Sequence, residues 1–151
     1  MVKAGDEIEN PVTGERIVFL RTAADTNGEL LELDDFWARP DHRVAEHVHP
    51  EMEERWEVID GTVRFQVDGV EHTAGTGDVV VAPAGARHAS WNAGNGPAHL
   101  RIQMRPARRW EDFVVSLFAA ARDGRTDDQG VPEPALMLEL LREFHRELAP
   151  R

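Results

Sequence analysis

The feature that most constrains the fold of this chain is the stretch of residues 47–92, in which short apolar runs are separated by turn residues. Successive side chains of a β-strand point to opposite faces of the sheet. Val63, Phe65 and Val67 therefore share an apolar face, while the polar residues between them face the other way. Asp68-Gly69 follows directly and is typical of a tight hairpin turn. The pattern predicts a small barrel of short strands.

A carboxylate and two histidines follow the same alternation. His47 and His49 share one face of their strand, and Val48 takes the other. Glu54 has the parity of Trp56 and so falls on the apolar face of the next strand. A carboxylate is costly to bury alone, and a bound cation removes that cost. Because imidazole and carboxylate are good ligands for Fe, Mn, Ni, Co or Zn, the pattern indicates a metal site inside the barrel.

This stretch also resembles the two sequence motifs of the cupin family. The matching residues are His47, His49, Glu54 and Gly61 in the first motif, and Gly77, Pro83, Gly85, His88 and Asn92 in the second. The glycine that often opens the first motif is Asp41 here, which concerns only the turn before it. The resemblance covers residues 10–106 and implies a mainly β, single-domain cupin, that is, a double-stranded β-helix or jelly-roll barrel. It also implies one divalent transition metal per chain (Fe, Mn, Ni, Co or Zn), with the ligands His47, His49, Glu54 and His88.

Each part of this pattern has a plainer interpretation when taken alone. An isolated His-x-His is more often a solvated strand pair than a metal site. Glu54 has acidic neighbours and could belong to a charged surface. Glu53 is the rival ligand by proximity, but its parity places it with Arg55 and Glu57 on the other face. The joint match of both motifs favours the metal site.

Charge and composition limit the classes of partner. The formal net charge is −11 and the pI is near 5.0, which argues against nucleic acid or an anionic membrane as partner. The 151 residues contain no cysteine, so disulfides, thiolate chemistry and Fe–S clusters are excluded. The first residues lack the apolar core of a signal peptide, and no segment approaches the roughly 20 apolar residues of a membrane helix. We expect a cytoplasmic protein that binds a small molecule.

One carboxylate before the first motif is a candidate general base. In the expected strand from Leu30 to Trp37, Leu31 and Leu33 face the core, and Asp35 should follow them. A carboxyl in such a pocket has a raised pKa and can act as a base. The alternative is a bulge, or the end of the strand, that places Asp35 and its neighbour Asp34 in solvent.

Other stretches complete the barrel. The apolar run Val79–Val81 predicts a buried strand, and His99–Arg105 predicts the last strand. His42, His72 and His99 lie outside the motif positions, and we expect all three at the surface.

The periodicity changes after Pro106. Apolar residues recur at helical spacing in one segment, Trp110, Phe113, Val114, Leu117, Phe118 and Ala121, and again after Pro134, at Met137, Leu141, Phe144 and Leu148. We therefore predict a barrel over residues 1–106 and a helical extension over residues 107–151, packed on the barrel or at an interface. The family resemblance favours a homodimer.

Four protein ligands leave two positions open on an octahedral ion. With iron, this resembles the non-haem oxygenases. With another of these metals, the ion could act as a Lewis acid for an isomerase, lyase or cyclase. A non-catalytic module that binds a small molecule or a metal is the third class. Trp56, Val63, Phe65 and Met104 are candidate pocket walls, and all four are equally well explained as core.

Overall fold

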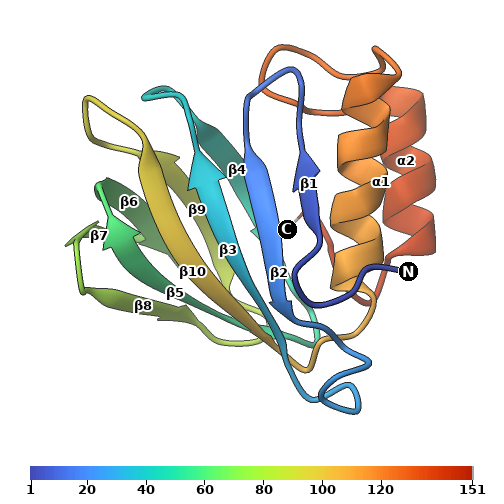
Figure 1. The fold of residues 1–151 in the computed structure, drawn as a ribbon, viewed down its shortest axis with the longest axis horizontal. Coiled ribbons are helices and arrows are strands. Elements are labelled where there is room, and N and C mark those ends of the chain that lie inside the picture. Colours follow the sequence, from blue (N-terminus) through green and yellow to red (C-terminus); the bar gives the residue numbers. More distant parts are fainter. Residues whose placement is uncertain (151) are drawn as a thin grey trace.

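The computed structural model describes residues 1–150 and is mainly β, with two antiparallel sheets and two C-terminal helices (Figure 1). The larger sheet has the order β1-β2-β3-β10-β5-β8, and the smaller one has the order β4-β9-β6-β7. The elements are β1 (Glu7–Glu9), β2 (Arg16–Arg21), β3 (Leu31–Trp37), β4 (Arg43–Val48), β5 (Glu53–Asp60), β6 (Thr62–Val67), β7 (Val70–Gly75), β8 (Val79–Ala82), β9 (Arg87–Asn92), β10 (Ala98–Arg105), α1 (Trp110–Arg122) and α2 (Pro134–Glu143). The predicted fold class, a mainly β barrel followed by two helices, is confirmed.

The chain passes repeatedly from one sheet to the other between β3 and β10, which encloses a core between the two sheets. Strand alternation fills this core. In β10, Leu100, Ile102 and Met104 are buried, while the residues between them are only half-buried. Phe65 of β6 faces them from the smaller sheet and is fully buried.

The prediction of a buried strand at Val79–Val81 is wrong. Strand β8 lies at the edge of the larger sheet and pairs only with β5. Val79 and Val81 remain 44% and 41% exposed, whereas Val80 packs against the core and pairs with Trp56. An apolar triplet does not reveal whether a strand is covered on both faces, and this one is covered on one.

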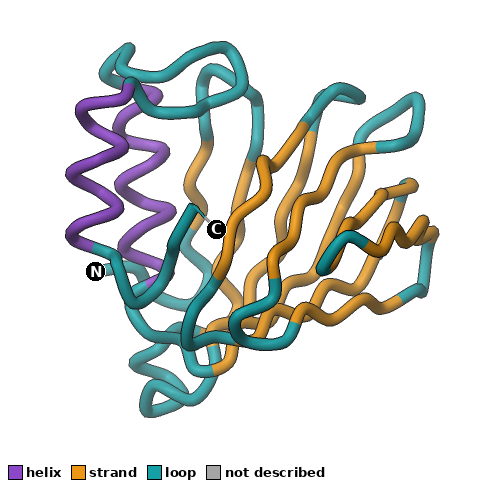
Figure 2. The backbone as a smooth tube through the Cα atoms, turned by 180° about the vertical axis from the view of Figure 1, so that it is seen from behind, coloured by secondary structure: helices purple, strands orange, loops and turns teal. Residues whose placement is uncertain are grey.

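The two helices lie side by side next to β1 (Figures 1 and 2). Phe113, Val114 and Phe118 of α1 belong to the same hydrophobic cluster as the strand residues of the barrel. Phe144, which follows α2, is 1% exposed and contacts the ring of Phe113 at 5.4 Å between centroids. The division of the chain at residue 106, the homodimer and the location in the cytoplasm stay predictions.

The segment after α2 returns to the barrel. Val48 and Ala149 exchange two backbone hydrogen bonds of 2.9 Å, which extends the end of β4 by one antiparallel bridge. Arg146 contributes an ion pair with Glu51, at 3.0 Å. Residues 145–149 are thereby held against the segment that carries His49. Within residues 1–150, neither helix is long and apolar enough to cross a membrane.

Candidate metal centre

Three strands bring the four candidate ligands together. His47 lies in β4 with His49 just beyond it, Glu54 lies in β5 and His88 lies in β9. Their nearest nitrogen and carboxylate oxygen atoms all lie within 4.8 Å of one another. Strand parity predicted that Glu54 faces inward and Glu53 outward. The burial agrees, because Glu54 is buried and Glu53 is only half-buried.

A bulge in β4 lies directly before His47. Val44 pairs with Ser90 and His47 pairs with His88, so β4 has one more residue than β9 between these two pairs. The extra residue interrupts the regular alternation of side chains between Val44 and His47. β-Bulges are a common means of directing a side chain into a functional site.

The three histidine rings share one orientation. Each Nδ1 faces a backbone carbonyl oxygen: His47 faces Ala45 at 2.8 Å, His49 faces Glu147 at 2.8 Å, and His88 faces Ala86 at 3.1 Å. A carbonyl oxygen can only accept a hydrogen bond, so Nδ1 carries the hydrogen in each ring. In a neutral ring the other nitrogen, Nε2, is then a bare lone pair.

These lone pairs face one another and a carboxylate. The Nε2 atoms of His47 and His49 are 3.3 Å apart, and Glu54 Oε1 lies 3.0 Å from His49 Nε2. His88 Nε2 is 3.4 Å from the same oxygen but has no hydrogen bond of acceptable geometry, although it is buried. Acceptor atoms packed in this way repel one another unless a cation lies between them. The donor set therefore fits a divalent transition metal, and the carbonyls that orient the rings are typical outer partners of metal-bound histidines.

The electrostatics of the cluster also favour a cation. Burial, followed by the neighbouring charges of His49 and His88, lowers the pKa of His47 to about 3. Burial alone would raise the pKa of Glu54, but the adjacent His49 and His88 rings outweigh it and hold that pKa well below its ordinary value. Near neutral pH the carboxylate is therefore ionised, and it gives the centre a negative charge.

We expect the bound metal to be lost as the pH falls below about 6, because an imidazole nitrogen must be neutral to bind a cation. Burial lowers the pKa of His88, but the adjacent Glu54 carboxylate outweighs it and leaves this pKa above its ordinary value. His88 therefore takes a proton at a higher pH than His47, and protons compete with the metal as the pH falls. Metal content after dialysis against a chelator, over a series of pH values, tests this. Full retention at about pH 4 would argue against histidine ligands.

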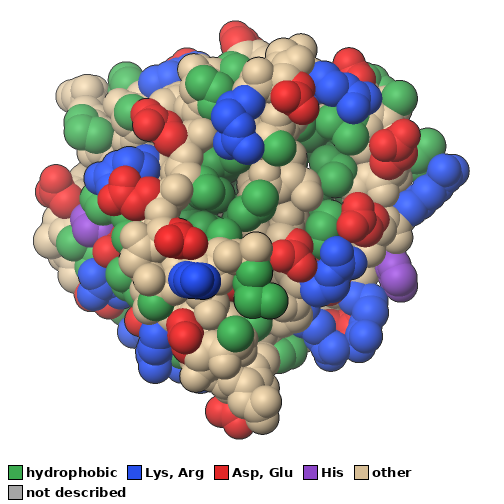
Figure 3. Space-filling model, turned by 45° about the vertical axis from the view of Figure 1, so that its right-hand side comes forward, with side chains coloured by type: hydrophobic (Ala, Val, Ile, Leu, Met, Phe, Trp, Pro, Cys, Tyr) green, Lys and Arg blue, Asp and Glu red, His purple; other side chains and the backbone are tan. Residues whose placement is uncertain are grey.

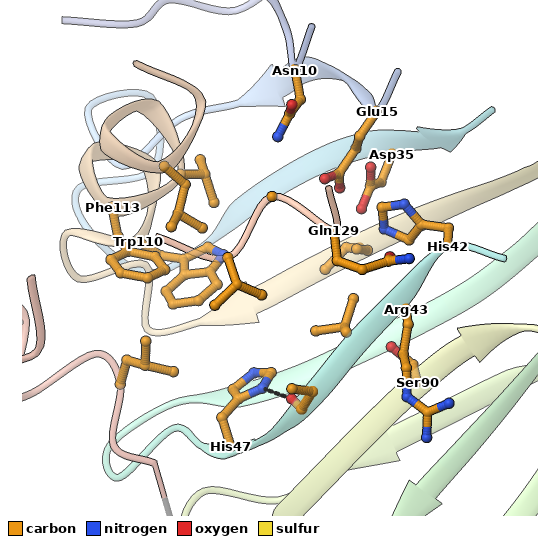
Figure 4. Close-up of a pocket in the computed structure, with 18 of the residues that line it drawn as sticks. Asn10, Glu15, Asp35, His42, Arg43, His47, Ser90, Trp110, Phe113 and Gln129 are labelled. Atoms are coloured by element: carbon orange, nitrogen blue, oxygen red, sulfur yellow. Dashed lines mark hydrogen bonds between the residues drawn. The ribbon is translucent and has the colours of Figure 1, made fainter. Parts of the chain in front are cut away.

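The cluster lies at one end of a cavity of about 330 Å³, which is within the usual size range of small-molecule sites. Its walls are mainly apolar, and Trp110 and Phe113 of α1 stand beside His47 (Figure 4). The edge of the Trp110 ring contacts His49, at 4.6 Å between centroids. A space-filling view turned toward the helices shows apolar side chains around a hollow, bordered by charges of both signs (Figure 3).

Only one of the four candidate pocket residues lines the cavity, and the other three lie in the core. Trp56 lines the cavity. Val63, Phe65 and Met104 are completely buried in the hydrophobic core and are not among the residues that line the cavity. Inward parity alone does not distinguish a cavity wall from a core position.

Asp35 also faces the cavity. Strand β3 runs without interruption to Trp37, whose indole N–H donates to Asp35 Oδ2 at 3.1 Å. The alternative that Asp34 and Asp35 lie in solvent is wrong, because they are 9% and 6% exposed. Burial raises the pKa of Asp35 to about 6, while Asp34 pairs with Arg101 at 2.9 Å.

The prediction that His42 lies at the surface is wrong, whereas His72 is exposed as expected and His99 is half-buried. His42 is 4% exposed and stacks on Trp37, with 4.5 Å between ring centroids. His99 stacks on Phe36 at 4.1 Å, and its side chain is 22% exposed. In both cases a neighbouring aromatic ring shields the histidine from solvent.

Sequence reasoning missed several polar residues that line the cavity, and three of them lie near Asp35: Glu15, His42 and Gln129 (Figure 4). Glu15 has the parity of Ile17 and Phe19, which are buried in β2, so strand alternation carried a usable signal. The other two lie in loops, where no periodicity indicates direction.

Comparison with known proteins agrees with the fold. Residues 38–102 match the family described as cupin domain. Protein SchB of Streptomyces halstedii is 35% identical over 68 residues, which are 45% of this chain and 49% of that protein. The chain thus spans about half the length of this relative.

Solved structures extend the likeness to most of the chain. KdgF from Halomonas sp. superposes with a TM-score of 0.61 at 15% identity, over 70% of this chain and 90% of its own. An RmlC-like cupin from Shewanella frigidimarina gives 0.59 at 24% identity, over 70% and 86%. At these identities the likeness establishes the fold.

Proposed function

We propose that this chain, which belongs to the cupin superfamily, is a metal-dependent oxygenase that acts on a small, largely apolar organic molecule. The proposed ligands are His47, His49, Glu54 and His88. One observation supports metal binding above all others. Three imidazoles present Nε2 toward one carboxylate, and a backbone carbonyl at each Nδ1 fixes the tautomer in which Nε2 is free to bind a metal.

The protein's own residues would hold and enclose the substrate. Trp56, Trp110 and Phe113 offer apolar surface for its body and would help to exclude water from the reaction site. An octahedral ion with four protein ligands has two further positions and would supply redox chemistry with molecular oxygen when it is iron.

Oxygen consumption is the direct test. The protein should be loaded anaerobically with Fe(II), mixed with a panel of small hydroxylated aromatic and carbonyl compounds, and exposed to oxygen in an electrode cell. We expect oxygen uptake that depends on one class of compound and is lost in Glu54→Ala. Uptake that is equal in wild type and Glu54→Ala, or absent across the panel, would contradict the proposed oxygenase.

A second candidate, a redox-neutral isomerase, lyase or cyclase, is favoured by the carboxyls of Asp35 and Glu15 in the same cavity. The metal would then serve as a Lewis acid, and Asp35, whose pKa is raised to about 6 by burial, would act as general base. Anaerobic turnover of the same panel by zinc-loaded protein would select this candidate. Binding without turnover under either condition would indicate a non-catalytic module.

A further inference from the structure

The cavity has a second polar end, away from His47. Glu15 precedes β2, Asp35 lies in β3, His42 lies in the loop before β4, and Gln129 lies in the loop between the helices. Figure 4 shows the two carboxyls side by side, with the His42 ring and the Gln129 amide next to them. None of these residues belongs to the candidate metal centre.

Several atoms at this end lack a partner within the protein. His42 Nδ1 is buried without a hydrogen bond, and Asp35 Oδ1 has no partner beyond the adjacent Glu15 carboxyl. The two residues are only 4% and 6% exposed. The Gln129 Oε1 atom is also buried without a hydrogen bond. Buried polar atoms are almost always hydrogen-bonded. Unsatisfied atoms of His42 and Gln129, next to the carboxyl pair of Glu15 and Asp35 on one cavity, therefore indicate a group that they bind.

The charge state of this end decides what that group is. Burial and the charge of Asp35 raise the pKa of Glu15 well above its ordinary value, so Glu15 keeps its proton. The pKa of Asp35 is raised by burial only to about 6, so Asp35 is a carboxylate near neutral pH. Burial lowers the pKa of His42 to about 4, which leaves a neutral ring. This end is acidic and rich in acceptors, and it would repel an anion.

We propose that Glu15, Asp35 and His42 form a subsite that binds a hydroxyl or amino group at the end of the ligand distant from the metal. The inference rests on the proposed function, because it assumes that the other end of the ligand reaches the metal. Trp110, Phe113 and Ile102 line the cavity and suit an apolar body. The ligand class is therefore an apolar or aromatic compound with metal-coordinating oxygens at one end and a hydrogen-bond donor at the other.

Three hydroxamic acids, which chelate metals through two oxygens, test this with zinc-loaded protein in calorimetric titrations. They are a naphthalene hydroxamic acid, an analogue with a hydroxyl on the distal ring, and an analogue with a carboxyl there. We expect the hydroxyl analogue to bind about tenfold more tightly than the parent, since a hydrogen bond to a charged group can contribute that much. The carboxyl analogue should bind more weakly than the parent.

Variants assign the effect to the subsite. Asp35→Asn can keep an acceptor for the Trp37 N–H, but it replaces the carboxylate with an amide. It should abolish the hydroxyl advantage, measured as the ratio of the affinities of the hydroxyl analogue and the parent for the same variant. His42→Phe preserves stacking on Trp37 and should reduce the advantage. Asp34→Asn is the matched control, because Asp34 pairs with Arg101 and does not line the cavity.

The possible failures are distinct. If the parent binds and the hydroxyl adds nothing, or if Asp35→Asn and His42→Phe both keep the full advantage, the subsite is overturned while the metal-dependent function stands. If zinc binds but no hydroxamate does, the open metal positions of the proposed function are refuted, and the subsite is refuted with them.

Discussion

His88→Ala is expected to lower the affinity for the metal by more than about 100-fold, because it removes a proposed direct ligand. Loss of an outer partner alone typically costs roughly 10–100-fold. His88 is paired with His47 across β4 and β9, and its Nε2 points at Glu54 from 3.4 Å. Elemental analysis of protein purified without chelator, followed by zinc titration of the stripped protein, measures the change.

His72→Ala is the matched control, because this histidine lies on the exposed edge strand β7 and should keep wild-type metal content. A His47/His49 double alanine variant removes two proposed ligands and should lose the metal. If this double variant retained as much metal as the wild type, the assigned ligands would be wrong.

The convergence of the candidate ligand side chains could be predicted because two independent signals agreed: the alternation of side chains along the strands, and the resemblance to the two cupin motifs. Strand parity placed Glu54, and not Glu53, on the inward face, and the structure buries Glu54 as expected. Parity also continued through β3 to Asp35, although the sequence left open that this carboxylate lay in solvent. Alternation predicts direction well wherever a strand has one buried and one open face.

The sequence gives no such signal for loops and edges. His42 and Gln129 reach the cavity from loops, whose direction depends on packing that no local period encodes. The triplet at Val79–Val81 is apolar whether its strand is central or at an edge, and here it is at an edge. The β4 bulge was also invisible, because it depends on the register with β9.

Removal of the C-terminal segment is the second change that should strongly weaken metal binding. The carbonyl of Glu147 accepts the Nδ1–H of His49 at 2.8 Å, so residues far from both motifs orient a candidate metal ligand. A chain that ends at Phe144 lacks this carbonyl and the bridge between Val48 and Ala149. We expect it to bind metal roughly 10–100-fold more weakly, as is typical when the outer partner of a metal-bound histidine is lost. Competition with a fluorescent zinc chelator measures the difference.

A chain that ends at Ala149 is the matched control, since it keeps both the carbonyl and the bridge and should bind like the full-length protein. Arg146→Ala removes only the ion pair with Glu51 and separates that surface contact from the backbone effect. The shorter chain also loses Leu148, which is 9% exposed, so its thermal melting must be measured beside its affinity. If the chain that ends at Phe144 stays folded and binds metal as tightly as the control, the ring of His49 is fixed by the barrel alone. The C-terminal segment would then only cover the cavity.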